Sequence, residues 1–161
     1  MYHRSDDVKL SNKGLYAVRA LFDIAFYNAG RPTQVKDIAE REGIPPRFLE
    51  QIFQDLKRTG LVASKRGPQG GYTLAKKAAD VSLGDVVRAL EGPIDLGDSG
   101  RDERVRRRGG ADTRRVISAV FQDLSVSVGS CFDAVTVADI CSRAEAMGIG
   151  RPGAQRNVYF I

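Results

Sequence analysis

The sequence predicts a mainly α-helical fold that carries one small β-hairpin, and three observations support this prediction. Amphipathic segments with helical spacing follow one another between residues 11 and 59. After Gly60 the spacing of apolar residues changes from about 3.6 to about 2, the period of a strand. Helical spacing then returns and continues to residue 144. At roughly 150 residues per domain, the 161 residues suffice for one such domain with an appended element.

The first helix is expected over residues 11–29. Its apolar residues recur at spacings of three and four, and they are Leu15, Val18, Leu21, Phe22, Ala25 and Phe26. Arg19 and Asp23 lie off this face. The sequence Asn-Ala-Gly-Arg-Pro at 28–32 predicts the end of the helix.

Two further helices are expected to form a helix-turn-helix. Thr33 can cap the second helix, residues 34–42, and Gly43 offers the left-handed conformation that ends it. Pro46 suits the first turn of the third helix, which is expected to run to Thr59. The residues of the third helix that face inward are Leu49, Ile52, Phe53 and Leu56.

A β-hairpin is expected directly after the third helix, with strands at residues 61–64 and 71–74. The residues between the strands include two cations, one amide and glycines that let backbone N–H groups approach a phosphate closely. A hairpin in this position is a wing, so the sequence predicts a winged helix-turn-helix over residues 1–95.

The rest of the sequence predicts a last helix of the winged-helix domain, then a loop, then a C-terminal region. Ser82 caps a helix with Asp85 at its third position, and Gly92 ends it. Residues 96–110 have almost no apolar side chains and predict a flexible, arginine-rich loop. Residues 111–161 are expected to hold a dimerisation helix and a C-terminal extension.

The dimerisation helix is expected over residues 112–128. Its apolar stripe is too extensive to remain exposed to water, which predicts an obligate homodimer. The stripe consists of Val116, Ile117, Val120, Phe121, Leu124 and Val128. Thr136 with Asp139 predicts the start of one more helix.

Charge is concentrated in one part of the chain. Residues 44–77 hold seven cations and two acids, so this segment alone carries +5, equal to the formal net charge of the whole chain. Such a segment is typical of a surface for a polyanion such as nucleic acid, or simply of a solvated face. At the start of the third helix, Arg47 can bond guanine, Glu50 can accept from cytosine and Gln51 can bond adenine.

Other classes of function are disfavoured. His3 is the only histidine, and the chain has no nucleophile–base constellation or glycine-rich nucleotide motif, so no catalytic residue, metal ligand or enzyme activity is expected. The longest stretches without charge are nine residues, against about 20 for a membrane span. No secretory segment follows the N-terminus, which favours the cytoplasm.

Several segments carry a family resemblance: residues 9–21, 35–41, 48–53, 60–74 and 91–93. Over about residues 8–95 they resemble the Rrf2 family of bacterial winged-helix transcriptional regulators. The resemblance implies a homodimer that binds double-stranded DNA at a partly palindromic operator, with repression as the expected outcome. The alternative is a winged helix used for protein contact, which would favour exposed apolar residues over the wing cations.

The resemblance also implies roles for single residues. Glu50 and Gln51 match the family's base-reading pair, Arg66 matches its wing arginine, and Ser11 and Lys13 match the start of the first helix that holds phosphate. Arg47 stands where relatives often have a small hydroxyl residue. The full expected DNA-binding set is Lys9, Ser11, Lys13, Arg47, Glu50, Gln51, Lys65, Arg66, Gly67, Gln69 and Tyr72.

Well-known family members hold an iron–sulfur cluster through three cysteines between the Gly92-Pro93 element and the dimer helix, and this chain has none there. No cofactor is therefore expected. Cys131 and Cys141 are either small packing residues or a thiol switch, and the sequence leaves both interpretations open. It specifies no effector.

Overall fold

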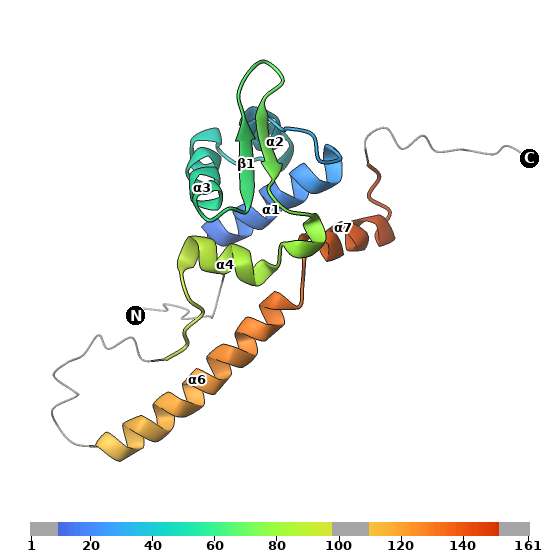
Figure 1. The fold of residues 1–161 in the computed structure, drawn as a ribbon. Coiled ribbons are helices and arrows are strands. Elements are labelled where there is room, and N and C mark those ends of the chain that lie inside the picture. Colours follow the sequence, from blue (N-terminus) through green and yellow to red (C-terminus); the bar gives the residue numbers. More distant parts are fainter. Residues whose placement is uncertain (1–9, 98–109, 152–161) are drawn as a thin grey trace, which may run out of the picture.

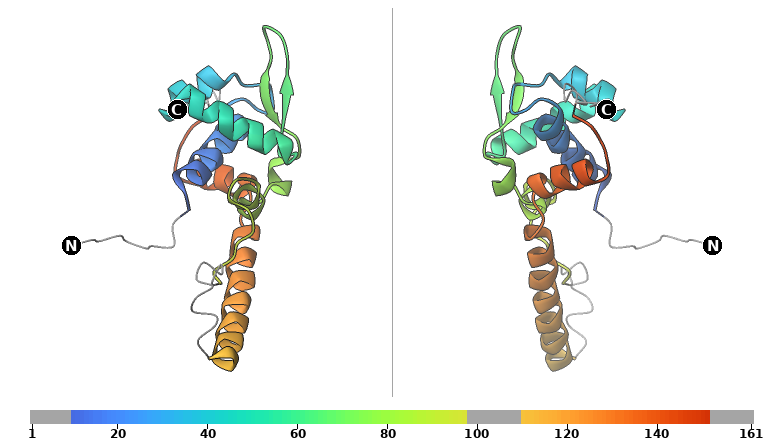
Figure 2. Two further views of the ribbon diagram at one scale, coloured as in Figure 1. Left: turned by 90° about the vertical axis from the view of Figure 1, so that its left-hand side faces the viewer. Right: turned by 90° about the vertical axis from the view of Figure 1, so that its right-hand side faces the viewer.

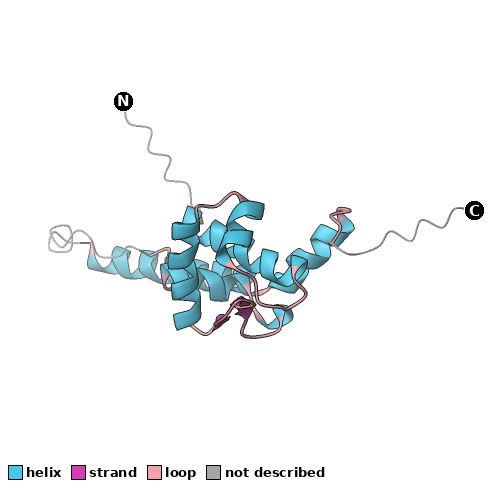
Figure 3. Cartoon of the chain, turned by 90° about the horizontal axis from the view of Figure 1, so that it is seen from above, coloured by secondary structure: helices cyan, strands magenta, loops and turns pink. Residues whose placement is uncertain are grey.

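Helices make up most of the structure, and among the described residues the strands occur only in one hairpin (Figure 3). The structure is a computed structural model that describes residues 10–97 and 110–151. Lys9 and residues 98–109 of the expected arginine-rich loop lie outside the described residues. The elements in chain order are α1 (Asn12–Tyr27), α2 (Val35–Glu42), α3 (Pro46–Arg58), β1 (Val62–Lys65), β2 (Gly71–Leu74), the 3₁₀ helix η1 (Ala78–Asp80), α4 (Leu83–Glu91), α6 (Ala111–Asp133) and α7 (Val137–Ala146). The predicted fold class is confirmed.

Helix α1 lies at the centre of the fold, where α2, α3, α4 and α7 all pack against it (Figure 1). Because neighbours cover it on several sides, the single apolar face predicted for α1 is wrong in two places. Leu15 is 48% exposed, whereas Asp23 is completely buried. The Asp23 carboxylate accepts two hydrogen bonds of 2.7 Å from the Arg41 guanidinium on α2, which compensates for its burial.

The helix-turn-helix forms as predicted, except at the start of α2. Thr33, the expected cap, is buried and pairs with Tyr72 of β2 through backbone hydrogen bonds of 2.9 and 2.8 Å. Gln34 occupies the capping position without a side-chain bond. At the other end Gly43 has φ 64°, the left-handed conformation expected of it. The predicted inward residues of α3 are all buried: Leu49, Ile52, Phe53 and Leu56.

The hairpin pairs β1 with β2 in antiparallel register, from Val62 opposite Leu74 to Lys65 opposite Gly71. β1 therefore begins one residue later than predicted. Gly71 has φ +141°, and a Cβ there would lie 2.3 Å from the Thr33 carbonyl oxygen. Only glycine allows the backbone of β2 to approach the α1–α2 connection this closely.

After α4 the chain forms two further helices, α6 and α7, which pack against different parts of the fold. Both predicted capping boxes are present, at Ser82 with Asp85 and at Thr136 with Asp139. α6 continues to Asp133, five residues beyond the predicted stripe. It packs on α4 at its C-terminal end and projects away from the helical body, opposite to the hairpin (Figure 2). No helix among the described residues is long and apolar enough to cross a membrane.

Helix α7 returns to the N-terminal helices. It packs against α1 and η1, and three of its residues are buried in the same core as α1: Val137, Cys141 and Ala144. The core of the winged helix therefore contains residues from the region that the sequence grouped with the dimerisation helix.

Candidate nucleic-acid interface

Helix α3 presents one polar face to solvent. Arg47, Glu50 and Gln51 are all exposed, as their spacing relative to the buried residues predicts. Gln54, one turn beyond Gln51, is also exposed and was not among the residues predicted from the sequence. The signal that would have found it is the spacing of three from Gln51. The resulting row offers both donors and acceptors to a ligand that lies along the helix.

The wing carries the second group of predicted residues. Lys65, Arg66, Gly67 and Gln69 are exposed on the hairpin, which projects beside α3 (Figure 1). Gly67 has φ +109°, a conformation that favours glycine.

Unlike the other predicted wing residues, Tyr72 packs against α3. Its ring stacks on Phe53 of α3 with centroids 4.3 Å apart and planes inclined by 10°. Tyr72 is therefore half-buried and holds β2 against α3, rather than lying on the outer surface of the wing.

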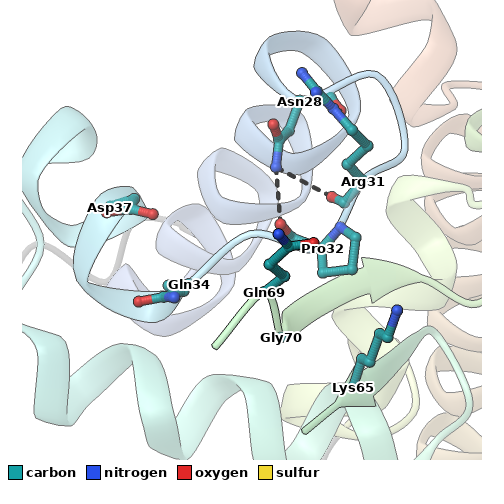
Figure 4. A pocket seen from close by; sticks show the side chains of 8 residues that line it. All are labelled: Asn28, Arg31, Pro32, Gln34, Asp37, Lys65, Gln69 and Gly70. Atoms are coloured by element: carbon teal, nitrogen blue, oxygen red, sulfur yellow. Dashed lines mark hydrogen bonds between the residues drawn. The ribbon is translucent and has the colours of Figure 1, made fainter. Parts of the chain in front are cut away.

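An open pocket lies between the wing and the start of α2 (Figure 4). The Gln34 side chain donates a hydrogen bond of 3.2 Å to the Pro68 carbonyl in the wing loop. Asn28 bonds the Pro32 carbonyl at 2.9 Å and the Thr33 hydroxyl at 2.9 Å. The Gln34 bond connects the wing loop to the start of α2, whereas the Asn28 bonds stabilise the connection between α1 and α2. The lining residues are Asn28, Arg31, Pro32, Gln34, Asp37, Lys65, Gln69 and Gly70.

The start of α1 makes contacts within the chain. Ser11 caps α1 by accepting from the Gly14 N–H at 3.1 Å, and its own N–H and hydroxyl donate to Glu91 at the end of α4. The Lys13 ammonium lies 2.7 Å from the Asp55 carboxylate on α3. This hydrogen bond lowers the pKa of Asp55 below its ordinary value. Lys13 therefore reaches the side of α3 but is already paired with an acid.

Unlike Lys13, the cations of the wing and of the start of α3 have no carboxylate partner among the described residues. Within residues 10–97 and 110–151, Arg47, Lys65 and Arg66 form no ion pair with a carboxylate. Three unpaired cations on neighbouring elements produce a positive surface available to an anion.

The predicted dimerisation face of α6 is uncovered. The exposed fractions of Val116, Phe121 and Leu124 are 63%, 40% and 46%, and Val128 is half-buried. Nothing in the described part of the chain packs over this face, which is a contiguous apolar surface of the kind found at protein interfaces.

A comparison with protein families identifies the chain. The model of the Rrf2 family, described as iron-dependent transcriptional regulators, matches residues 10–143. The chain belongs to the Rrf2 family. Curated relatives of this Rrf2 protein include the helix-turn-helix regulators named IscR of Vibrio atlanticus, 37% identical over 88% of this chain and 80% of that one, and of Escherichia coli, 33% identical over 88% and 85%.

Solved structures of Rrf2 proteins show the same fold. IscR of T. potens has a TM-score of 0.69 and 34% identity, covering 91% of this chain and 95% of that one. CymR of Bacillus subtilis, named as a global cysteine regulator, has a TM-score of 0.64 and 30% identity, covering 84% and 98%. This Rrf2 protein is accordingly a DNA-binding transcriptional regulator and not an enzyme.

The family description names iron, so we tested whether the residues of this Rrf2 protein fit a metal centre. The chain has two cysteines and one histidine. Among the described residues, no group of three or more His, Cys, Asp or Glu side chains is arranged to hold a metal ion. Cys131 is exposed on α6, whereas Cys141 is buried in the core, and burial raises the pKa of its thiol. The chain has no cysteine between the Gly92-Pro93 element and α6, so its donor set does not fit a cluster held by three cysteines in that segment.

Proposed function

We propose that this Rrf2 protein acts as a homodimeric repressor that reads a partly palindromic DNA operator. The uncovered apolar face of α6 is the observation that carries the proposal. A monomer would leave this face in water, whereas two copies that pair through it bury it in both chains. A two-fold dimer of this kind presents two copies of α3 to two half-sites about one helical turn apart.

Within each half-site, α3 is proposed to lie in the major groove. Residues near the start of a recognition helix meet base edges, and Arg47, Glu50 and Gln51 occupy that position. Arg47 pairs with guanine, Gln51 with adenine, and Glu50 accepts from cytosine. Gln54, one turn further, extends the same row along the groove.

The wing is proposed to contact the flanking DNA backbone and minor groove. Arg66 and Lys65 supply charge, while Gly67 and Gln69 let the loop approach closely. Tyr72 contributes by holding the wing against Phe53, which fixes its distance from α3.

The start of α1 is proposed to hold a phosphate near α3. An ammonium group has three donors, and the contact with Asp55 uses one of them, so Lys13 retains donors for a phosphate oxygen. Ser11 is proposed to assist from the same helix start.

The proposal is tested first by selecting bound sequences from random duplex DNA with the purified protein. Gln51→Ala should then lose about 1–3 kcal/mol of discrimination at one base pair and retain non-specific binding. Lys65→Ala should weaken all sequences alike and reduce the salt slope by about one. Arg143→Ala on α7 removes one exposed positive charge away from this surface and serves as the matched control.

Two outcomes would contradict the proposal. If Gln51→Ala weakened binding to every operator variant equally, Gln51 would not read a base. If a monomer bound the selected sites as tightly as a dimer, the α6 face would not be needed for DNA binding. In vitro transcription from a promoter that contains the selected site tests whether the protein represses or activates. We expect less transcript when the protein is added.

A further inference from the structure

We infer that Arg88, Asp133 and Gly84 fix the direction of α6 relative to the winged helix, and that they thereby determine which half-site spacing the dimer accepts. The inference rests on the proposed homodimer. It assigns a positioning role to residues that do not themselves touch DNA.

The first observation is the ion pair between α4 and the last residue of α6. The Arg88 Nη2 lies 2.6 Å from Asp133 Oδ1, and Nη1 lies 3.4 Å from Oδ2, so the guanidinium contacts both carboxylate oxygens. Arg88 is itself held by Asp85, one turn earlier on α4, at 3.3 Å. The Ser82 hydroxyl approaches Asp133 Oδ1 at 3.4 Å. The end of α6 is therefore tied to the first two turns of α4.

The second observation is the absence of a side chain at Gly84. A Cβ at this position would lie 1.8 Å from Asp133 Oδ1, so the carboxylate occupies the space that any other residue would fill. Gly84 lies in the first turn of α4, where the helix dipole favours a negative charge. Glycine at this position leaves room for the Asp133 carboxylate to contact Arg88 and Ser82 together.

Backbone bonds reinforce the same junction. The Leu83 N–H donates to the Val135 carbonyl at 2.8 Å, and the Val137 N–H donates to the Val81 carbonyl at 2.9 Å. The turn after α6 is therefore paired with the residues that precede and begin α4.

A second attachment lies further along α6. The Leu96 N–H donates to the Ser125 hydroxyl at 2.8 Å, and Ser125 is buried. Ser125 and Asp133 are eight residues apart, or about 12 Å along the helix axis. Leu96 lies in the segment that follows α4, so this bond holds that segment along α6, while the Asp133 contacts join α6 to α4 itself.

The Asp133 attachment and the dimer face lie on different sides of α6. With about 3.6 residues per turn, Asp133 falls on the side of α6 roughly opposite Val120 and Leu124, whereas Ser125 lies at the edge of the stripe, one turn after Phe121. When two copies pair through the stripe, the side of α6 that carries Asp133 faces the winged helix of the same chain. The separation of the two α3 helices then depends on the angle at the α4–α6 junction.

The length of α6 determines how strongly a change of angle at the α4–α6 junction affects the half-site spacing. Its 23 residues span about 34 Å, so a pivot of about 10° moves one end by about 6 Å relative to the other. This exceeds the 3.4 Å or so between successive base pairs. A small change at the junction therefore changes which spacing brings both α3 helices into register.

Gly84→Ala tests the inference because it displaces Asp133 without removing a charge. Alanine also favours a helix more than glycine does, so α4 itself is not weakened. Gly129→Ala is the matched control, since it is the same substitution in α6 and its Cβ would have nothing within 4 Å. Binding is measured to the selected operator and to versions with one or two base pairs inserted or deleted between the half-sites.

We expect Gly84→Ala to reduce the preference for the best spacing over the next best about two- to fivefold, the range that an exposed ion pair supports. Asp133→Asn, which keeps the side-chain volume, should do the same and replaces Gly84→Ala if that variant does not fold. Gly129→Ala should keep the wild-type profile.

An unchanged spacing profile in a folded Gly84→Ala or Asp133→Asn variant, with affinity for the best operator retained, would overturn the inference alone. A wild-type protein that binds single and paired half-sites equally would overturn the proposed homodimer, and with it this inference.

Discussion

Replacing Arg41 by methionine should destabilise the fold strongly, because Arg41 is the ion-pair partner of a fully buried carboxylate. Asp23 has no exposed surface, and both of its oxygens accept hydrogen bonds of 2.7 Å from Arg41. These hydrogen bonds raise the pKa of Arg41 above its ordinary value, although burial opposes the shift. Methionine retains the apolar stem of arginine but none of its donors.

The magnitude follows from what remains in the core. Removing one partner of a buried ion pair costs about 3–5 kcal/mol, because the other charge is left without compensation. The Arg41 side chain is 38% exposed, so water can reach part of the site, which lowers the expectation to about 2–3 kcal/mol. Arg41 also lies 5.7 Å from the centre of the Tyr27 ring, and losing that contact adds about 0.5 kcal/mol. We expect a total loss of about 3 kcal/mol.

Urea denaturation measures this loss directly. With a slope of about 2 kcal/mol/M, the midpoint should fall by about 1.5 M. The melting temperature should fall by about 6–12 °C for a chain of this size. The double variant Asp23→Leu with Arg41→Met should recover part of the loss, because no unpaired charge then remains in the core.

Arg19→Met is the matched control. Arg19 also links α1 to α2, through Glu42, and also lies 5.7 Å from a ring centre, that of Tyr16. The Glu42 side chain keeps 14% of its surface exposed whereas Asp23 keeps none, so we expect a smaller loss, about 1 kcal/mol. Equal losses in Arg41→Met and Arg19→Met would refute the argument that burial of Asp23 determines the cost.

Three further results are expected. Leu124→Asp should give a monomer by light scattering and abolish operator binding, because it places a charge in the apolar face of α6; a dimer that persists would show that this face is not the interface. Asp55 has a pKa lowered by the hydrogen bond from Lys13, so its contribution to stability is present above the ordinary value of 3.8 and is lost as the pH falls through the folded value. Asp55→Asn should therefore make the free energy of unfolding fall less steeply below about pH 4 in denaturation curves, and an unchanged slope would contradict this. Native protein treated with a thiol reagent should be labelled at Cys131 before Cys141, as peptide mass spectrometry can check, because Cys141 is buried and its pKa is raised.

Local sequence signals predicted the elements whose stabilising contacts are also local. The two capping boxes and the glycine end of α2 depend on residues three or four apart, so their sequence patterns specify them. Thr33 was misassigned because its backbone pairs with Tyr72, far along the chain. Asp23 was placed outside the core because its partner, Arg41, lies 18 residues away on another helix.

The candidate interface was predictable to a similar extent. Helical spacing identified Arg47, Glu50 and Gln51 as exposed, because the opposite face of α3 is strongly apolar. The sequence did not indicate that Lys13 would meet Asp55, or that the Tyr72 ring would stack on Phe53. Both contacts depend on how α1 and the hairpin are placed against α3, which only the packed structure determines.

The return of α7 to α1 bears on how the protein is made. During synthesis the first 97 residues leave the ribosome well before Val137, Cys141 and Ala144, which complete the apolar core beside α1. Until those residues emerge, part of α1 has no apolar cover, and the nascent winged helix exposes a surface open to chaperones or to aggregation. Because α6 precedes α7 in the chain, this part of the core is completed only after the whole dimer helix has been synthesised.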